Sequence, residues 1–301
     1  MNGFLIANKP TGRTSSDVVV FVRRRLPKGT AVGHGGTLDP EASGVLPVCV
    51  GSATRLFDYI IDKQKTYVAR LKLGVETDTQ DATGQVVATA PVNVGEDEVR
   101  DILPRFTGDI EQVPPMYSAL KRDGRRLYQL ARKGQSVELE PRKCRVDGIE
   151  LLGREDGDTY LLRVRCGKGV YIRTLCHDIG QALGCGGHMQ SLERVAAGIF
   201  SLEEALSLDQ IDALAREERL ESALLPLDAP LAHLPAVRVG ERSRHAVLNG
   251  NLLRAAWLDA PAPEAEAVRV YLNDEFAGIG APQPDGSVKF RAMLYRAGEE
   301  A

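Results

Sequence analysis

The sequence predicts an α+β protein in which a mixed sheet flanked by helices precedes a small β-rich domain. Two observations lead to this prediction. Strand-like segments alternate with helix-like segments over roughly the first 230 residues, and residues 235–301 contain short β-type runs between Asn-Gly, Pro-Ala-Pro and Pro-Asp-Gly turns. The 301 residues are 43% hydrophobic and 26% charged, which is enough for two domains with cores. We therefore expect domains over residues 1–230 and 235–301.

The first elements are predicted by local patterns. Thr14, followed three residues later by Asp17, forms a capping box that predicts the start of a helix. The apolar stripe of this helix comprises Val18, Val22 and Leu26. Further along, Lys65–Leu73 alternates strictly between apolar and polar residues, which predicts a half-buried strand with Tyr67 on its apolar face.

Later elements follow from the same patterns. Residues 98–106 have the apolar spacing of a helix, and Pro104 is expected to strain its last turn. Residues 160–166 alternate as a strand, and the turn at 167–169 leads into a helix that ends before Gly184. The β-type runs of the second domain lie at residues 237–239, 268–272, 276–279 and 288–290.

Composition excludes several classes of protein. No run approaches the ~20 apolar residues that a membrane-spanning helix needs, and the apolar N-terminal stretch is too short for a signal peptide, so we expect a cytoplasmic location. The five cysteines are scattered and form no CxxC pair, and the five histidines lack metal-ligand spacing. Neither a disulfide framework nor a metal site is expected.

Charge is distributed unevenly along the chain. The formal net charge is only −3, but residues 1–35 carry six basic side chains and one acidic, and residues 120–145 carry nine basic and three acidic. Residues 201–235 compensate with eight acidic side chains and two basic. A charged run is commonly just a solvated face, but two basic segments, the second with tyrosines in or beside it, also suit RNA phosphates and unstacked bases.

The residues typical of a catalytic loop are concentrated in residues 33–47, where four glycines and two prolines surround His34 and Asp39. A residue before proline is pushed towards extended geometry, and glycines allow a substrate to approach the backbone closely. The alternative reading is an ordinary turn, because Asp, Gly and Pro are common turn residues.

This loop and five further motifs resemble the TruB family of bacterial tRNA pseudouridine synthases over roughly residues 1–200. The matching segments are 8–10 with 14–15, 65–67, 77–81, 115–121 and 171–174. The resemblance implies a pseudouridine-synthase fold with a largely antiparallel sheet, a basic RNA-gripping insertion at about residues 115–145, and a PUA-like RNA-binding domain at the C-terminus. One departure is Gly35, where the family commonly has threonine.

The resemblance implies isomerisation of uridine 55 in the TΨC loop of tRNA. The base must be flipped out of its stack, and a carboxylate must assist cleavage of the N1–C1′ bond before the base rejoins through C5. The reaction is redox-neutral, so no cofactor is expected. The implied partner is tRNA, with no membrane, no obligatory protein partner and a monomeric enzyme.

Three residues match the catalytic positions of the family. Asp39 matches the essential aspartate, Tyr67 the active-site tyrosine that stacks on uracil, and Arg173 the arginine that pairs with the aspartate. A cation close to Asp39 would keep that carboxylate ionised. Without the motifs, we would interpret Tyr67 as a core residue and Arg173 as a surface residue.

Other residues match positions implied in RNA contact or support. His34 is expected to remodel the T loop, Leu192 to pack against the target base, and Lys9 to support the active-site tyrosine. The remaining expected RNA contacts are Asp81, Lys121, Arg125, Arg126, Arg132, Lys133 and Tyr171. Two other functions stay open at this point: a non-catalytic RNA-binding or tRNA-folding protein and, more distantly, a hydrolytic N-glycosidase.

Overall fold

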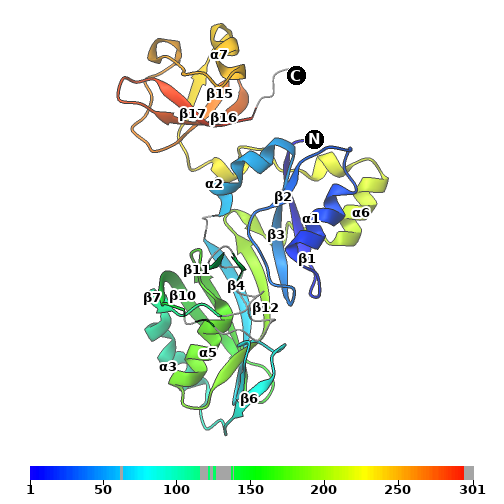
Figure 1. The fold of residues 1–301 in the computed structure, drawn as a ribbon, viewed down its shortest axis with the longest axis vertical. Helices are drawn as coiled ribbons and strands as arrows, with labels where there is room; N and C mark the ends of the chain where they lie inside the picture. Colours follow the sequence, from blue (N-terminus) through cyan, green and yellow to red (C-terminus); the bar gives the residue numbers. More distant parts are fainter. Residues whose placement is uncertain (62–63, 116–120, 123–124, 127–136, 138, 295–301) are drawn as a thin grey trace.

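A computed structural model describes residues 1–61, 64–115, 121–122, 125–126, 137 and 139–294. A large sheet with its helices forms most of the molecule, and a smaller sheet lies at one end of it (Figure 1). Within the described residues, no helix is long and apolar enough to cross a membrane.

The large sheet holds nine strands, seven of which follow one another across its width. In spatial order these are β1 (Gly3–Lys9), β3 (Ala42–Val50), β12 (Gly187–Ala197), β4 (Lys65–Leu73), β11 (Thr159–Cys166), β10 (Arg142–Arg154) and β7 (Gly108–Gln112). β2 (Val32–His34) pairs with β3, and β13 (Phe200–Ser201) pairs with β12. The β3–β12 pair is parallel and the other pairs are antiparallel, so the expectation of a mixed, largely antiparallel sheet is confirmed.

The register of β12 brings three distant segments side by side. Leu192 lies opposite Ala42 on one side and Ala69 on the other. Arg194, two residues later, lies opposite Gly44 and Tyr67. Since alternate residues share a face of a strand, the residues at 192 and 194 project from the same face of β12.

Helices cover the sheet where its strands are apolar. α1 (Ser15–Arg23) and α6 (Leu208–Arg216) pack on β1 and β3, whereas α5 (Ile172–Ala182) packs on β4, β11 and β12 (Figure 1). The predicted capping box is present, with Thr14 as the N-cap of α1. The helix ends earlier than its apolar stripe, because Leu26 lies beyond Arg23 although its side chain is buried.

The helix expected at residues 98–106 is placed differently. α3 spans Glu96–Ile102, and residues 103–106 form a separate 3₁₀ turn with Pro104 in its first positions. Proline has no N–H to donate to the preceding turn, so it ends the α-helical hydrogen bonding. α5 agrees better with its pattern, since Gly184 follows the C-cap with φ +77°.

The smaller sheet contains β14 (Ala236–Val239), β15 (Val268–Leu272), β16 (Glu275–Pro282) and β17 (Val288–Met293), in that order. All four predicted β-type runs are therefore strands. Phe4 and Ile6 of the first sheet share a hydrophobic cluster with Leu231 and with Ile279 of the second. This apolar contact joins the two sheets.

Short elements complete the fold. They are the helices α2 (Phe57–Ile61) and α7 (Arg244–Leu248), the hairpins β5 (Val75–Thr77) with β6 (Val86–Thr89) and β8 (Lys121–Arg122) with β9 (Arg125–Arg126), and 3₁₀ turns at Gly51–Leu56, Leu103–Phe106, Leu220–Ala223, Ala229–Leu231, Glu241–Ser243 and Ala255–Trp257.

Candidate active site

The loop between β2 and β3 carries Asp39 and is fixed by two contacts to the N-terminal region. The Ser15 hydroxyl accepts from the Leu38 amide at 2.8 Å and donates to the Leu38 carbonyl at 3.0 Å. On the other side of Asp39, the Pro40 carbonyl accepts from the Gly12 amide at 2.8 Å. The residues on both sides of the carboxylate are thus held by the main body of the protein.

Lys9 is a fully buried cation beneath this loop. Its Nζ donates to the carbonyls of Arg13 at 2.6 Å, Pro10 at 2.9 Å and Pro40 at 3.0 Å. Burial lowers the pKa of this ammonium from 10.5 to about 8, an effect that the nearby carboxylates of Glu41 and Asp39 oppose. The three hydrogen bonds connect Lys9 to the loop that carries Asp39, whereas the sequence predicted a role in supporting the active-site tyrosine.

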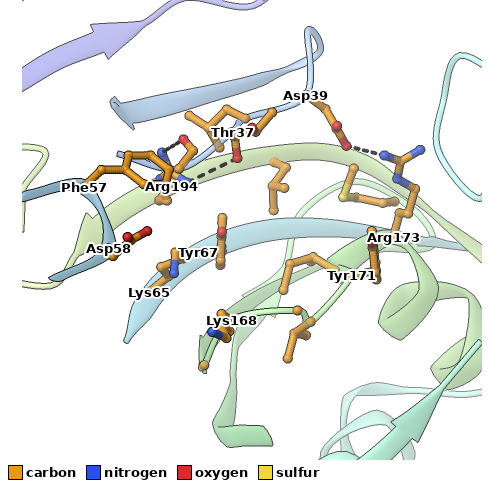
Figure 2. Close-up of a pocket in the computed structure, with 18 residues that line it drawn as sticks. Thr37, Asp39, Phe57, Asp58, Lys65, Tyr67, Lys168, Tyr171, Arg173 and Arg194 are labelled. Carbon is orange, nitrogen blue, oxygen red and sulfur yellow. Dashed lines mark hydrogen bonds and ion pairs between the residues drawn. The ribbon is translucent and has the colours of Figure 1, made fainter. Parts of the chain in front are cut away.

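Arg173 joins two carboxylates that are far apart in the sequence. The first turn of α5 places its side chain, only 7% exposed, so that Nη2 pairs with Oδ2 of Asp39 (Figure 2). Its Nη1 lies 3.3 Å from Oδ2 of Asp81, whose other carboxylate oxygen, Oδ1, accepts from the hydroxyl of Thr79 at 2.8 Å. Asp39 itself is 49% exposed, so the buried cation holds a carboxylate that opens to the solvent.

Tyr67 lies on β4 with its side chain buried in the wall of the same site. Burial raises the pKa of its hydroxyl above 10, and the Arg194 guanidinium beside it opposes the rise. The Tyr67 side chain lines the cavity of the site, and its hydroxyl is hydrogen-bonded to the Arg194 guanidinium.

A cavity of about 740 Å³ unites these groups. Asp39, Arg173, Tyr67, Tyr171 and Leu192 all line it, so five of the predicted site residues converge on one space (Figure 2). This volume falls in the range of small-ligand sites, which is about 300–1,000 Å³. An extruded nucleotide therefore has room beside the carboxylate.

Tyr171 stands at the start of α5, where it is the N-cap residue. Its amide donates to Oε1 of Gln112 at 3.0 Å, and its carbonyl accepts from Nε2 of the same side chain at 3.2 Å. Gln112 is nearly fully buried, so this pair of bonds fixes the entry into α5 and, with it, the position of Arg173.

Arg194 is a site residue that the sequence reasoning missed. Its side chain is 1% exposed, lines the cavity and donates to the carbonyls of Gly36 and Val45. The available signal was its spacing, because it follows Leu192 by two residues on a strand and so shares its face. Lys65 also lines the cavity from the start of β4.

His34 and Gly35 lie next to this site but do not line the cavity. The His34 Nδ1 is buried and has no hydrogen-bond partner among the described residues, and burial followed by the charge of Arg194 lowers its pKa. At Gly35, a Cβ would come 2.7 Å from Cδ1 of Ile60. The side chain of Ile60 therefore occupies the space that a larger residue would need here.

The expected RNA-gripping residues are only partly described. Lys121, Arg125 and Arg126 lie in the β8–β9 hairpin, and their side chains fall outside the described structure, as do Arg132 and Lys133 altogether. Within the described ranges, no cluster of three His, Cys, Asp or Glu residues could hold a metal ion.

Two family profiles match the chain over most of its length. Residues 23–172 match the N-terminal domain of the TruB family of pseudouridylate synthases, and residues 173–232 match the C-terminal domain described for tRNA pseudouridylate synthase B. The predicted resemblance is therefore confirmed.

Similar proteins agree with these matches. The tRNA pseudouridine synthase B of Aromatoleum aromaticum is 44% identical over 98% of this chain and 93% of its own, and that of Stutzerimonas stutzeri is 44% identical over 98% and 96%. Among solved structures, a Cbf5–Nop10–Gar1 complex (29% identity, TM-score 0.73, 98% of this chain and 85% of that one) and an H/ACA RNP bound to a substrate RNA containing 2′-deoxyuridine (28%, 0.74, 98% and 86%) share the fold.

Proposed function

Because the chain belongs to the TruB family of pseudouridylate synthases, we propose that it isomerises uridine to pseudouridine at position 55 in the TΨC loop of tRNA. The N1–C1′ bond breaks, the uracil turns, and a C5–C1′ bond forms. The proton on C5 leaves and N1 gains one, so that atoms and electrons balance without a cofactor.

The observation that carries this proposal is the placement of Asp39 at the edge of the 740 Å³ cavity with Arg173 as its partner. A carboxylate kept ionised by a cation can attack the nucleotide or stabilise positive charge on the sugar. The half-exposed position of Asp39 leaves it open to an incoming nucleotide, whereas the buried guanidinium fixes its direction.

The walls of the cavity suit a flipped uracil. Tyr67 offers an aromatic ring and Leu192 an apolar side chain, and both line the cavity. Stacking on such surfaces contributes about 1–3 kcal/mol per base, comparable to the few kcal/mol that unstacking the base costs. We assign to Tyr67 the stacking role and, in its ionised form, which the adjacent charge of Arg194 favours against burial, removal of the C5 proton.

The remaining assignments concern RNA binding. Residues 1–230 form the catalytic unit, residues 235–301 a PUA-like RNA-binding domain, and the basic stretch at about 115–145 grips the T stem and loop of tRNA. The positive net charge of residues 120–145 supports this role in binding RNA.

The enzyme acts as a monomer without an obligatory protein partner. Its five cysteines are free thiols, which fits the reducing environment of the cytoplasm.

Tritium release from tRNA labelled at C5 of uridine tests the proposed reaction. The wild-type protein should release tritium, and Asp39→Asn should lower the single-turnover rate by a factor on the order of a thousand or more. Asp97→Asn, an exposed change on α3, is the matched control and should keep the wild-type rate.

Two results would contradict the proposal. Binding of tRNA without tritium release would identify a non-catalytic RNA-binding protein, and liberation of free uracil would identify an N-glycosidase. Wild-type release by Asp39→Asn would remove Asp39 from the chemistry.

A further inference from the structure

Arg194 occupies the middle of the large sheet, on the strand that lies between β3 and β4. It is the largest of the fully buried side chains of the described protein. On one side it lies opposite Gly44, where a Cβ would come 2.2 Å from the Arg194 carbonyl oxygen, and on the other side it lies opposite Tyr67. Gly44 thus permits the close approach of β3 to β12 at this point.

The guanidinium of Arg194 reaches both ends of the segment that carries Asp39. Its Nε donates to the Val45 carbonyl at 2.7 Å, and its Nη2 donates to the Gly36 carbonyl at 3.1 Å. Nη1 lies 3.5 Å from the Thr37 carbonyl (Figure 2). The guanidinium is planar and holds its N–H donors in a fixed geometry, so it can join the two ends of this segment in a way that the compact ammonium of lysine cannot.

The partners of this cation differ from those of Arg173. Arg173 pairs with two carboxylates, whereas Arg194, within the described part of the chain, donates to main-chain carbonyls and to the hydroxyl of Tyr67. Burying a charge that is compensated only by neutral dipoles is costly, and an apolar side chain of similar size would commonly be as stable or more so. The fold alone therefore gives little reason for a guanidinium at this position.

We propose that Arg194 is a positioning residue for the isomerisation, fixing the Asp39 loop against the strand that carries Tyr67. This inference rests on the proposed function for its kinetic consequence. We call the hydrogen bonds from Arg194 to the carbonyls of Gly36 and Val45 the clamp. The clamp sets the distance between the Asp39 carboxylate and the Tyr67 ring that receives the base. A displacement of about 1 Å between reacting groups can lower a rate by about a hundredfold.

The test compares Arg194→Lys, Arg194→Gln and Arg194→Met with the wild-type protein. The matched control is Arg163→Met, which removes an exposed arginine from β11, a strand of the same sheet that β4 separates from β12. Hydrogen exchange of the amides at residues 36–45 reports on the clamp, and single-turnover tritium release reports on the chemistry. Circular dichroism establishes that each variant is folded at the assay temperature.

All three Arg194 variants should exchange faster at residues 36–45, and their single-turnover rates should fall by about 10- to 100-fold while the tRNA dissociation constant changes little. The rate of Arg194→Lys should be nearly as low as that of Arg194→Met, because both variants lose the guanidinium and its fixed arrangement of donors. The Arg163→Met control should match the wild type in both measurements.

Three results obtained with folded variants would overturn the proposal. They are wild-type exchange in the loop, a loss confined to tRNA binding, and full activity of Arg194→Lys, which would make charge alone sufficient. Failure of every Arg194 variant to fold would assign the side chain to the fold instead of to positioning. If the wild-type protein released no tritium, the proposed function would fail, but loop exchange would still decide whether the clamp exists.

Discussion

The two sheets of this protein bury different kinds of side chain. Around the cavity of the large sheet, Lys9, Arg173 and Arg194 are nearly or fully buried cations. Among the described residues from 235 to 294, which form the small sheet and its connections, the buried polar residues are Ser243 and Ser287, and the core cluster is apolar. The difference shows that the small sheet is held by the hydrophobic effect, whereas the large sheet carries buried charges that cost stability but organise a site.

The largest expected effect comes from the cation that joins two carboxylates. Arg173→Lys keeps the charge but loses the fork that contacts Asp39 and Asp81 together. We expect the single-turnover rate of tritium release to fall by about a hundredfold. Arg100→Lys, an exposed change in α3, serves as control and should retain its rate. An unimpaired Arg173→Lys variant would mean that the bridge does not orient Asp39.

A smaller, pH-dependent effect is expected from Lys9. Its charged form has three N–H donors for three carbonyls, and deprotonation near its pKa of about 8 leaves only two. The wild-type rate should therefore decline as the pH rises through about 8, by about tenfold, the equivalent of one charge-assisted hydrogen bond.

The matched variant is Lys9→Met, which should be slower at pH 7 and lack this decline. Both pH profiles are measured by single-turnover tritium release. A decline of the same size near pH 8 in Lys9→Met would assign the titration to another group.

A change in the small sheet should affect stability and leave the chemistry intact. Leu272 in β15 is 1% exposed within an apolar core, so Leu272→Ala should lower the free energy of unfolding by about 2–5 kcal/mol. Urea titration measures this loss, and single-turnover release at saturating tRNA should stay at the wild-type rate. A slowed chemical step in the folded variant would show that the two sheets are not functionally separate.

The smallest effect is expected at an exposed ion pair of the small sheet. Arg238 lies 3.1 Å from Asp274, whose side chain is fully exposed. Arg238→Gln should change the free energy of unfolding by less than about 1 kcal/mol, because water and salt screen such a pair. A larger loss in urea titration would show that cations also support the fold outside the cavity.

Local patterns predicted the elements that local interactions determine. The capping box at Thr14 and the alternation of Lys65–Leu73 both specify their elements within a few residues, and the structure has them as expected. The helix expected at residues 98–106 differs from α3, which spans Glu96–Ile102. The α-helix ends before residue 106 because the helix-breaking effect of Pro104 outweighs the apolar spacing.

Site residues that belong to sequence motifs could be predicted, whereas a site residue whose contacts depend on strand pairing could not. Asp39, Tyr67, Arg173 and Leu192 could be selected from motifs, and the structure brings them to one cavity. Arg194 could not, because its partners at residues 36–45 lie about 150 positions away and depend on the parallel pairing of β3 with β12. The single sequence contains no record of that pairing.

The double pairing of Arg173 has a consequence for charge balance during turnover. When Asp39 bonds covalently to the substrate or accepts a proton, it ceases to be an anion. The guanidinium of Arg173 is then still neutralised by Asp81, which two threonines hold in place. The protein thereby avoids leaving a buried cation without an anion midway through the reaction, so that Asp39 is free to change its charge while its anchor does not have to move.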